Sequence, residues 1–325
     1  MIDLSTTYGG LKLKSPLIVS SSGLTSSVER IKKIEQAGAG AVVLKSLFEE
    51  QIMFEVSSMS AGSDYPEASD YLVTYARENS LDQYLSLIRE AKAVVNIPVI
   101  ASINCVRSNE WIEFAKKIED SGADALELNI YFLPIEKDKD SKAYENAYLD
   151  LVSNVKKKTS LPVMVKLGHG FTNITWMVHQ LYQRGAASVV LFNRLYAPDI
   201  DTANLTFGSA EVLSSPADLR FSLRWIGIVS SQVKEMDLAA STGVHSGLAA
   251  IKQILAGATA VQVCSVLYRN GTDYLRDMIE EMKGWMQKNN YSSLSQFRGK
   301  MNYKNLKDPS VYERAQFIKY FSKMH

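Results

Sequence analysis

The chain has 325 residues, of which 46% are hydrophobic, and this is enough to bury a sizeable core. Its 36 basic and 35 acidic side chains give a net charge of +1, so no excess of cations is available to neutralise a nucleic acid. Two cysteines without zinc-site spacing predict neither a metal site nor a disulfide framework. No signal-peptide pattern and no membrane-spanning apolar run is present, so we expect a soluble, cytoplasmic protein.

Eight short apolar runs that end in polar residues are predicted to be β-strands. Four follow a helical stretch that stops at a glycine, as in AGAGAVVLKS at 37–46, and two follow a proline, as in SLPVMVKLG at 160–168. A glycine can close a helix in the left-handed conformation, and a proline cannot continue one. In chain order the predicted strands lie within 16–22, 37–46, 96–104, 121–130, 160–168, 184–193, 236–243 and 256–265.

The pattern within these strands indicates the fold. They show little polar alternation, which is typical of parallel strands covered by helices, and amphipathic stretches separate most of them. Eight such βα units in about 300 residues predict a (β/α)8 TIM barrel. We expect a single domain over 1–325 with a C-terminal tail after about 290. A doubly wound open sheet is the competing fold, and the lack of a G-x-G-x-x-G motif after a strand counts against it.

Two long connections, at about 47–80 and 194–224, interrupt this rhythm and are expected to be lids or binding loops. From about 272 we expect a helix and then a polar tail that packs across the barrel or against a partner subunit. The chain is therefore also a candidate homodimer.

Polar residues end every predicted strand, and a barrel holds its active site at these carboxyl ends. A lone Asn or Ser there is often only a strand leaving the core, but Lys45 and Lys166 end buried strands and need an anion or a path to solvent. The strand-end residues are Ser21, Ser22, Gly23, Lys45, Ser46, Asn104, Cys105, Asn129, Lys166, Asn193, Ser241, Thr242, Gly243, Cys264 and Ser265.

Small residues follow the last two predicted strands, in STGVHSG and CSVLYRNG. Free backbone N–H groups and a helix dipole at such turns can hold a phosphate, and barrels commonly do so after strands seven and eight. A mononucleotide phosphate there, with its ring over the strand ends beside a lysine, would describe FMN. A phosphorylated sugar, or a lysine that forms a Schiff base, is the alternative at this point.

Several segments, in this order and spacing, resemble the dihydroorotate dehydrogenase family, including the related domain of dihydropyrimidine dehydrogenase. They are SPLIVSSSG, LKSLFEEQ, ELNI, VMVKLG, VLFNR, ASTGVHSG and GATAVQVCSVLYRNG, and the resemblance runs over roughly 5 to 300. It implies an FMN-binding TIM barrel. The chain looks closest to the soluble class 1 enzymes, because no membrane-associating extension precedes the barrel.

The resemblance also implies roles for matching residues. Asn129 resembles the Asn between flavin and substrate, Asn193 a substrate-facing Asn, and Lys166 the lysine near flavin N1 and O2, where a cation stabilises the reduced flavin. The other expected flavin contacts are Ser21, Ser22, Gly23, Lys45, Ser46 and Asn104. The expected phosphate-side residues are Ser214, Ser215, Ser241, Thr242, Gly243, Cys264 and Ser265.

Three departures from the family pattern concern the substrate pocket. Phe132 stands where the family has its catalytic Cys or Ser, and phenylalanine cannot accept a proton. The family's N-S-x-G-x-x-N substrate loop should fall in 47–80, which instead contains SSMSAGSDYPEASDY, and Arg194 follows Asn193. The scaffold for flavin is retained, and the pocket for orotate is largely rewritten.

Other residues could replace the missing base. Tyr131 and His169 are the first candidates, followed by Cys105, whereas His179 and His245 are expected to be structural. Together with Lys166 and Asn129, the first two make up the predicted catalytic set.

The sequence thus predicts an FMN-dependent oxidoreductase acting on the CH–CH group of a small, pyrimidine-like substrate with altered specificity. One alternative is a flavin-binding barrel without dihydroorotate turnover, as an electron-transfer or accessory subunit. A sugar-phosphate barrel with lyase chemistry at Lys45 or Lys166 is another. The sequence has no Cys cluster for iron–sulfur and no second nucleotide domain, so we expect any electron carrier to bind separately.

Overall fold

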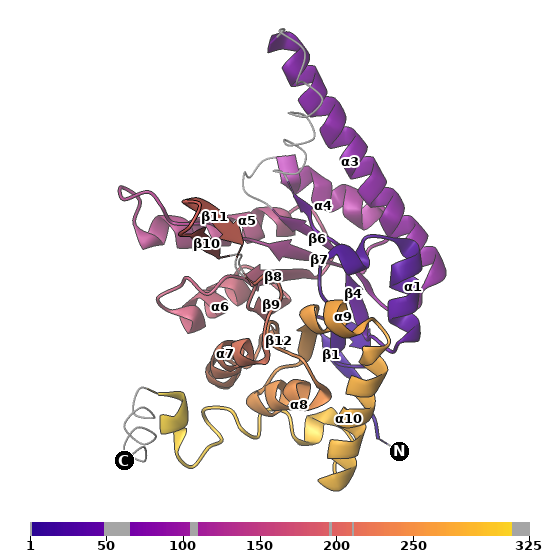
Figure 1. Ribbon diagram of the computed structural model, residues 1–325, viewed down its shortest axis with the longest axis vertical. Coiled ribbons are helices and arrows are strands. Elements are labelled where there is room, and N and C mark those ends of the chain that lie inside the picture. Colours follow the sequence, from indigo (N-terminus) through magenta and orange to yellow (C-terminus); the bar gives the residue numbers. More distant parts are fainter. Residues whose placement is uncertain (1, 49–65, 105–109, 195–196, 210, 314–325) are drawn as a thin grey trace.

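Eight parallel strands close into a barrel in the computed structural model, which describes residues 2–48, 66–104, 110–194, 197–209 and 211–313 (Figure 1). They are β3 (Leu17–Val19), β4 (Ala41–Val43), β6 (Val99–Asn104), β7 (Ala125–Asn129), β8 (Val163–Leu167), β9 (Ser188–Leu191), β12 (Asp237–Ala240) and β13 (Ala260–Val263). Pairing of β13 with β3, and of β4 with β6, completes the circle. All eight fall inside the predicted segments, so the TIM barrel is confirmed and the open sheet is excluded.

Helices connect successive strands and surround the barrel. They are α1 (Val28–Gln36), α3 (Pro66–Val94), α4 (Glu110–Asp120), α5 (Ser141–Lys156), α6 (Ile174–Gln183), α7 (Leu219–Gln232), α8 (Gly247–Ala256), α9 (Ser265–Asn270) and α10 (Tyr274–Lys288). The last of them closes the helical ring on the first, because the Arg276 guanidinium on α10 donates to the Gln36 carbonyl at the end of α1, at 3.3 Å. None of the described helices is long and apolar enough to cross a membrane.

The predicted long connection at 47–80 is partly wrong. Its first residues form β5 (Leu47–Phe48), which pairs with β6, and its end belongs to the 29-residue helix α3, which begins at Pro66. A proline is well tolerated in the first turn of a helix, so Pro66 can begin α3 inside the segment that was expected to be a loop. Residues 49–65, with most of the expected substrate loop, lie outside the described residues.

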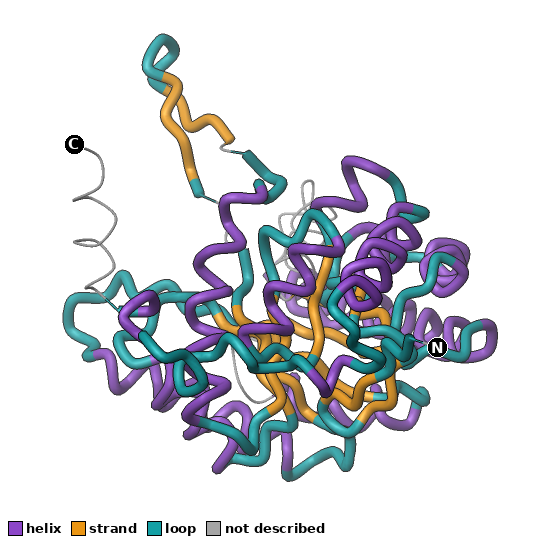
Figure 2. The backbone as a smooth tube through the Cα atoms, turned by 90° about the horizontal axis from the view of Figure 1, so that it is seen from below, coloured by secondary structure: helices purple, strands orange, loops and turns teal. Residues whose placement is uncertain are grey.

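The second long connection contains an antiparallel hairpin, β10 (Pro198–Asp201) and β11 (Thr206–Ser209), and then the short 3-10 helix η2 (Pro216–Asp218). Figure 2 shows that the hairpin stands clear of the barrel. Its side chains Ile200 and Phe207 are largely exposed.

The interior of the barrel is mainly apolar at the amino-terminal ends of the strands and polar at their carboxyl ends. A second hairpin, β1 (Thr6–Tyr8) and β2 (Leu11–Leu13), closes the amino-terminal end, where Tyr8 and Leu13 pack on the inward-facing side chains of the strands. Inward-facing positions recur every second residue, so on β7 they are Ala125, Glu127 and Asn129. The strands therefore lead from an apolar floor to polar groups at the mouth.

The C-terminal tail packs on the barrel's own helices. Phe297 is fully buried, with its ring centroid 5.1 Å from those of Trp285 and Tyr291. Further along, the N–H of Tyr303 donates to the carbonyl of Gly227 on α7 at 2.9 Å. The tail also contains two short 3-10 helices, η3 (Leu294–Gln296) and η4 (Pro309–Tyr312).

Candidate cofactor and active site

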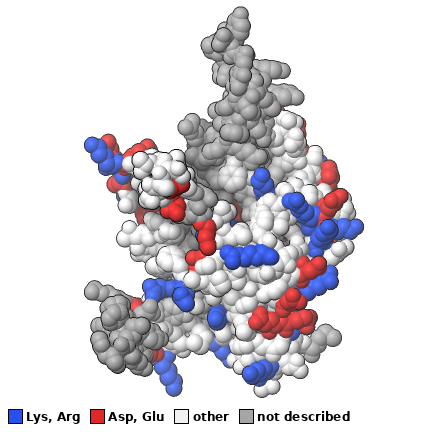
Figure 3. All heavy atoms as spheres, in the orientation of Figure 1, with Lys and Arg blue, Asp and Glu red and all other residues white. Residues whose placement is uncertain are grey.

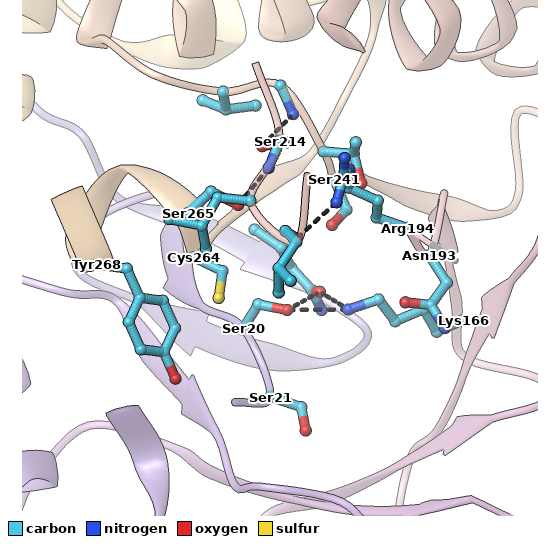
Figure 4. Close-up of a pocket in the computed structure, with 16 residues that line it drawn as sticks. Ser20, Ser21, Lys166, Asn193, Arg194, Ser214, Ser241, Cys264, Ser265 and Tyr268 are labelled. Atoms are coloured by element: carbon cyan, nitrogen blue, oxygen red, sulfur yellow. Dashed lines mark hydrogen bonds between the residues drawn. The ribbon is translucent and has the colours of Figure 1, made fainter. Parts of the chain in front are cut away.

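A cavity of about 490 Å³ opens at the carboxyl ends of the strands (Figure 4). Its predicted lining residues are Ser21, Lys166, Asn193, Ser214, Ser241, Thr242, Gly243, Cys264 and Ser265. Its other lining residues are Ser20, Arg194, Val212, Leu213, Val244, Gln262 and Tyr268. The volume lies in the range of ligand pockets, and the walls come from segments far apart in sequence.

Lys166 and Arg194 both line this cavity, and Lys166 is the buried cation of the two. It lies on β8, the residue is 5% exposed, and its amine donates to Ser20 Oγ and to Gln262 Oε1, both at 2.9 Å. A buried ammonium is costly unless its hydrogens have acceptors, and these two bonds hold the amine beneath the cavity (Figure 4). Neither Ser20 nor Gln262 was among the predicted site residues.

Lys45 behaves differently, although it also ends a strand. Its side chain is exposed, and it is not among the described residues that line the cavity. Ser46, next to it, is buried and joins Ser21 to Ser102: its hydroxyl lies 3.0 Å from Ser21 Oγ and 2.7 Å from Ser102 Oγ. This chain of hydroxyls fixes the wall between β3, β4 and β6.

The amide side chains at the mouth are partly paired. The Asn193 Nδ2 group donates to Asn129 Oδ1 at 2.9 Å, whereas the buried Asn104 Oδ1 has no partner among the described residues. A buried oxygen without a donor is costly, so Asn104 is a place where a ligand N–H or a water would be favourable.

The turns after β12 and β13 form the opposite wall. Thr242 and Gly243 have φ of +75° and +77°, and a Cβ on Gly243 would come within 2.1 Å of the backbone nitrogen of Leu219. Only glycine fits this second position, which brings the turn against the start of α7. The Ser265 hydroxyl accepts from the N–H of Ser214 at 3.0 Å and ties the two walls together.

At one helix start near these turns, N–H groups of the first turn already have side-chain acceptors. At the N-terminus of α8, Ser246 Oγ accepts from the N–H of Ala249, and the Glu281 carboxylate accepts from that of Leu248. The start of α9 borders the cavity, because Ser265, its first residue, lines the wall. The N–H groups of Leu267 and Tyr268 in its first turn donate to the carbonyl of Cys264. An anion at this wall would therefore meet the turns after β12 and β13 and the Ser265 position, rather than the start of α8.

Two titratable groups at this wall have shifted pKa values. Burial, aided by the nearby Arg269 cation, lowers the pKa of His245, whose Nε2 lies 3.0 Å from Ser214 Oγ. Burial raises the pKa of the Cys264 thiol, so this cysteine is a neutral wall residue at physiological pH.

Ser22, Gly23 and Ser215, like Lys45, Ser46, Asn104 and Asn129, are predicted residues that do not line the cavity. Ser22 caps the short 3-10 helix η1 (Gly23–Thr25) by accepting from the N–H of Leu24, and a Cβ on Gly23 would approach the Tyr268 hydroxyl to 2.8 Å. Ser215 precedes η2, where its N–H and hydroxyl donate to the Asp218 carboxylate. The cavity wall next to Ser215 is made by Ser214.

The candidate bases fall in different places. Tyr131 and Phe132 line a second cavity of about 260 Å³, in which the Phe132 ring meets the Tyr148 ring edge-on at 5.0 Å. His169 lines this cavity and also a third, of about 380 Å³, which shares Asn193 with the cavity of Lys166. His169 is thus the described candidate base that adjoins the main site; Cys105 lies outside the described residues.

Besides Ser20, the sequence prediction missed the polar residues Glu127 and Gln262. Both lie inside apolar strands, two positions before a predicted site residue, Asn129 and Cys264 respectively. Because side chains of a strand alternate between its two faces, this spacing of two was the signal that could have found them. No three His, Cys, Asp or Glu side chains in the described part of the chain are placed to share a metal ion.

Comparison with known proteins agrees with this geometry. The family model for dihydroorotate dehydrogenase matches residues 72–286. The catalytic subunit of dihydroorotate dehydrogenase B (NAD(+)) from Thermoplasma volcanium is 27% identical over 92% of this chain and 98% of its own length. A putative dihydroorotate dehydrogenase A (fumarate) from Aeropyrum pernix is 27% identical, with 91% and 97% covered.

A chloroplastic dihydropyrimidine dehydrogenase (NADP(+)) from Arabidopsis thaliana is 23% identical over 91% of this chain and 76% of its own length. These relatives are oxidoreductases by name, and the family model spans more than half of the chain. With the closed barrel and a buried lysine at the end of β8, the chain belongs to the dihydroorotate dehydrogenase family of oxidoreductases.

Proposed function

We propose that this protein is an FMN-dependent oxidoreductase that acts on the CH–CH group of a small, pyrimidine-like molecule other than dihydroorotate. The observation that carries the proposal is Lys166, a buried cation held by two hydrogen bonds under a cavity of about 490 Å³. FMN supplies the capacity to accept and donate hydride, which amino-acid side chains lack.

The residues present fit this cofactor. Lys166 provides positive charge for the ring, and the glycine-containing turn at Gly243 and the wall at Ser265 provide a place for the phosphate. Ser21, fixed by Ser46, would contact the ring from the side of β3. The start of α8 is not part of the proposed phosphate site, because the Glu281 carboxylate already accepts from the N–H of Leu248 there.

The protein's own groups then have separate tasks. Lys166 holds positive charge where charge develops in a hydride transfer, which favours the transition state over the ground state. The Asn129–Asn193 pair orients the substrate, and His169 accepts or donates the proton at the adjoining substrate carbon.

Altered specificity follows from residues at the substrate side. Phe132 packs on Tyr148 and cannot take a proton, and Arg194 brings a cation to the wall shared by the main and third cavities. A site that hydrogen-bonds its substrate rejects molecules that leave its polar groups unpaired. Several relatives are named catalytic subunits, so we also propose that electrons are exchanged with a separate protein or small molecule.

The test is the cofactor content of the purified protein. We expect about one FMN per chain, released by heat and identified by chromatography, and Lys166→Ala should weaken FMN binding far more than Lys45→Ala, because Lys45 is exposed. Absence of FMN, with no uptake on addition, would overturn the proposal. A colourless protein that forms a borohydride-trapped adduct with a phosphorylated sugar would support the lyase alternative.

A further inference from the structure

A buried carboxylate lies beneath Lys166. Glu127 points into the barrel from β7 and is fully buried. The Gln262 side-chain amide joins the two residues: its Nε2 donates to Glu127 Oε2 at 2.5 Å, and its Oε1 accepts from Lys166 Nζ at 2.9 Å. The amide therefore has one orientation, with its oxygen toward the cation and its nitrogen toward the carboxylate.

This arrangement limits the number of hydrogen bonds that the Lys166 amine can donate to a ligand in the cavity. A protonated lysine has three N–H donors, and two of them are used by Ser20 and Gln262. One donor is left for a ligand in the cavity. The amine is held from below, so a ligand receives a single directed hydrogen bond from it.

The carboxylate also changes the charge that a ligand experiences. Among the described residues, Glu127 is the buried acidic side chain and Lys166 the buried basic one, and Glu127 Oε1 lies 4.0 Å from Lys166 Nζ with no hydrogen-bond partner of its own. Together they form a pair without net charge. Opposite charges this close in a dry interior interact strongly, so the cation's effect on the cavity is partly cancelled.

We propose that Glu127, acting through Gln262, is a positioning residue that keeps Lys166 in place and lowers the reduction potential of the bound flavin. The inference rests on the proposed function. Reduced flavin carries negative charge near the lysine, which Lys166 favours and Glu127 opposes. Removing only the carboxylate charge therefore favours the reduced cofactor.

Glu127→Gln is the discriminating variant, because its side-chain oxygen can still accept from Gln262. We expect FMN to remain bound and the ratio of reduced to oxidised flavin at a fixed ambient potential to rise at least tenfold, which is about 30 mV for a two-electron couple. The potential is measured by anaerobic reductive titration against a reference dye. Glu127→Asp retains the charge and should stay near the parent value, even though it disturbs packing more.

Two further variants separate charge from folding. Ser188→Ala changes another fully buried polar side chain, on β9, and should leave the potential unchanged. If Glu127→Gln does not accumulate as folded protein, the double variant Lys166→Met/Glu127→Gln removes both charges together. Its potential should exceed that of Lys166→Met alone, and both are measured with enough added FMN to offset the weaker binding expected without Lys166.

The outcomes are distinguishable. An unchanged or lower potential in Glu127→Gln with FMN bound overturns the inference and leaves the proposed function standing. A shift of equal size in Glu127→Asp also overturns it, because packing rather than charge would then be responsible. A parent protein that takes up no FMN overturns the proposed function and this inference with it.

Discussion

The side-chain amide of Asn193 donates to the side-chain oxygen of Asn129 at 2.9 Å and so joins the ends of β9 and β7 over β8. Replacing Asn193 by alanine removes this bond and leaves a buried oxygen on Asn129. We expect a loss of about 1 kcal/mol in the free energy of unfolding, measured by urea denaturation, with FMN still bound.

A matched control is Asn204→Ala. The Asn204 side chain donates to Asp201 at a similar distance, 2.8 Å, but on the exposed hairpin, so its removal should have little effect on stability. Equal losses from both variants would show that the Asn193–Asn129 bond is no stronger than a surface bond.

Dihydroorotate should reduce the bound flavin very slowly or not at all. Oxidation requires removal of a proton as hydride leaves, and base assistance is typically worth about 10²–10⁴-fold, which Phe132 cannot provide. The measurement is anaerobic stopped-flow at the flavin absorbance band, with Phe132→Cys beside the parent.

Fast bleaching of the parent would contradict this prediction. The variant His169→Ala then identifies the responsible group, because His169 is the described candidate base that adjoins the cavity of Lys166.

Stability should fall with acidification because of His245. Burial lowers the pKa of His245 in the folded protein from its ordinary value of 6.5, so the unfolded chain takes up the proton first as the pH falls. Its contribution to stability is therefore present above about pH 6.5 and lost as the pH falls through the lowered pKa.

The variant His245→Gln should show a smaller loss of unfolding free energy between pH 7 and about pH 5 than the parent, measured on the apoprotein by denaturant titration. His179→Gln, on α6, controls for the loss of a histidine elsewhere. An unchanged pH profile in His245→Gln would contradict the assignment.

Gly40 should tolerate no side chain. Gly40 directly precedes β4, and a Cβ on it would lie 1.8 Å from the Ser15 carbonyl oxygen. Because that oxygen belongs to the backbone, moving it away would cost much free energy. We expect Gly40→Ala to lower the free energy of unfolding by about 3 kcal/mol or to prevent folding. Gly284→Ala, at an exposed position inside α10 with nothing within 4 Å, should instead raise it by about 0.5–1 kcal/mol. Thermal denaturation of both variants checks the opposite signs.

The barrel could be predicted because each strand is a continuous apolar run, and six of the eight have a glycine helix stop or a proline before them. How deeply each polar residue is buried could not be predicted from the sequence. Lys45 and Lys166 both end apolar strands in the sequence, yet the first is exposed and the second is 5% exposed. Their difference depends on how far each strand continues past the barrel rim, which only the closed sheet determines.

The cavity wall at the turns after β12 and β13 was predictable for a similar reason, since turns rich in small residues follow both strands. Glu127 escaped prediction because a charged residue inside an apolar run signals neither a helix nor a strand end. Its neutralising partner, Lys166, is distant in sequence and becomes visible only when β7 and β8 lie side by side. Figure 3 shows that charges of both signs are mixed on the face drawn, so surface charge gave no pointer to the site.

The hairpin of β1 and β2 covers the amino-terminal end of the barrel, next to the strand side chains that fill the interior there. Tyr8 and Leu13 fill its base, so small molecules enter and leave over one rim. An electron donor and an electron acceptor that both need the space above Lys166 must then take turns. Their steady-state kinetics should follow a ping-pong pattern, in which one product departs before the second substrate arrives.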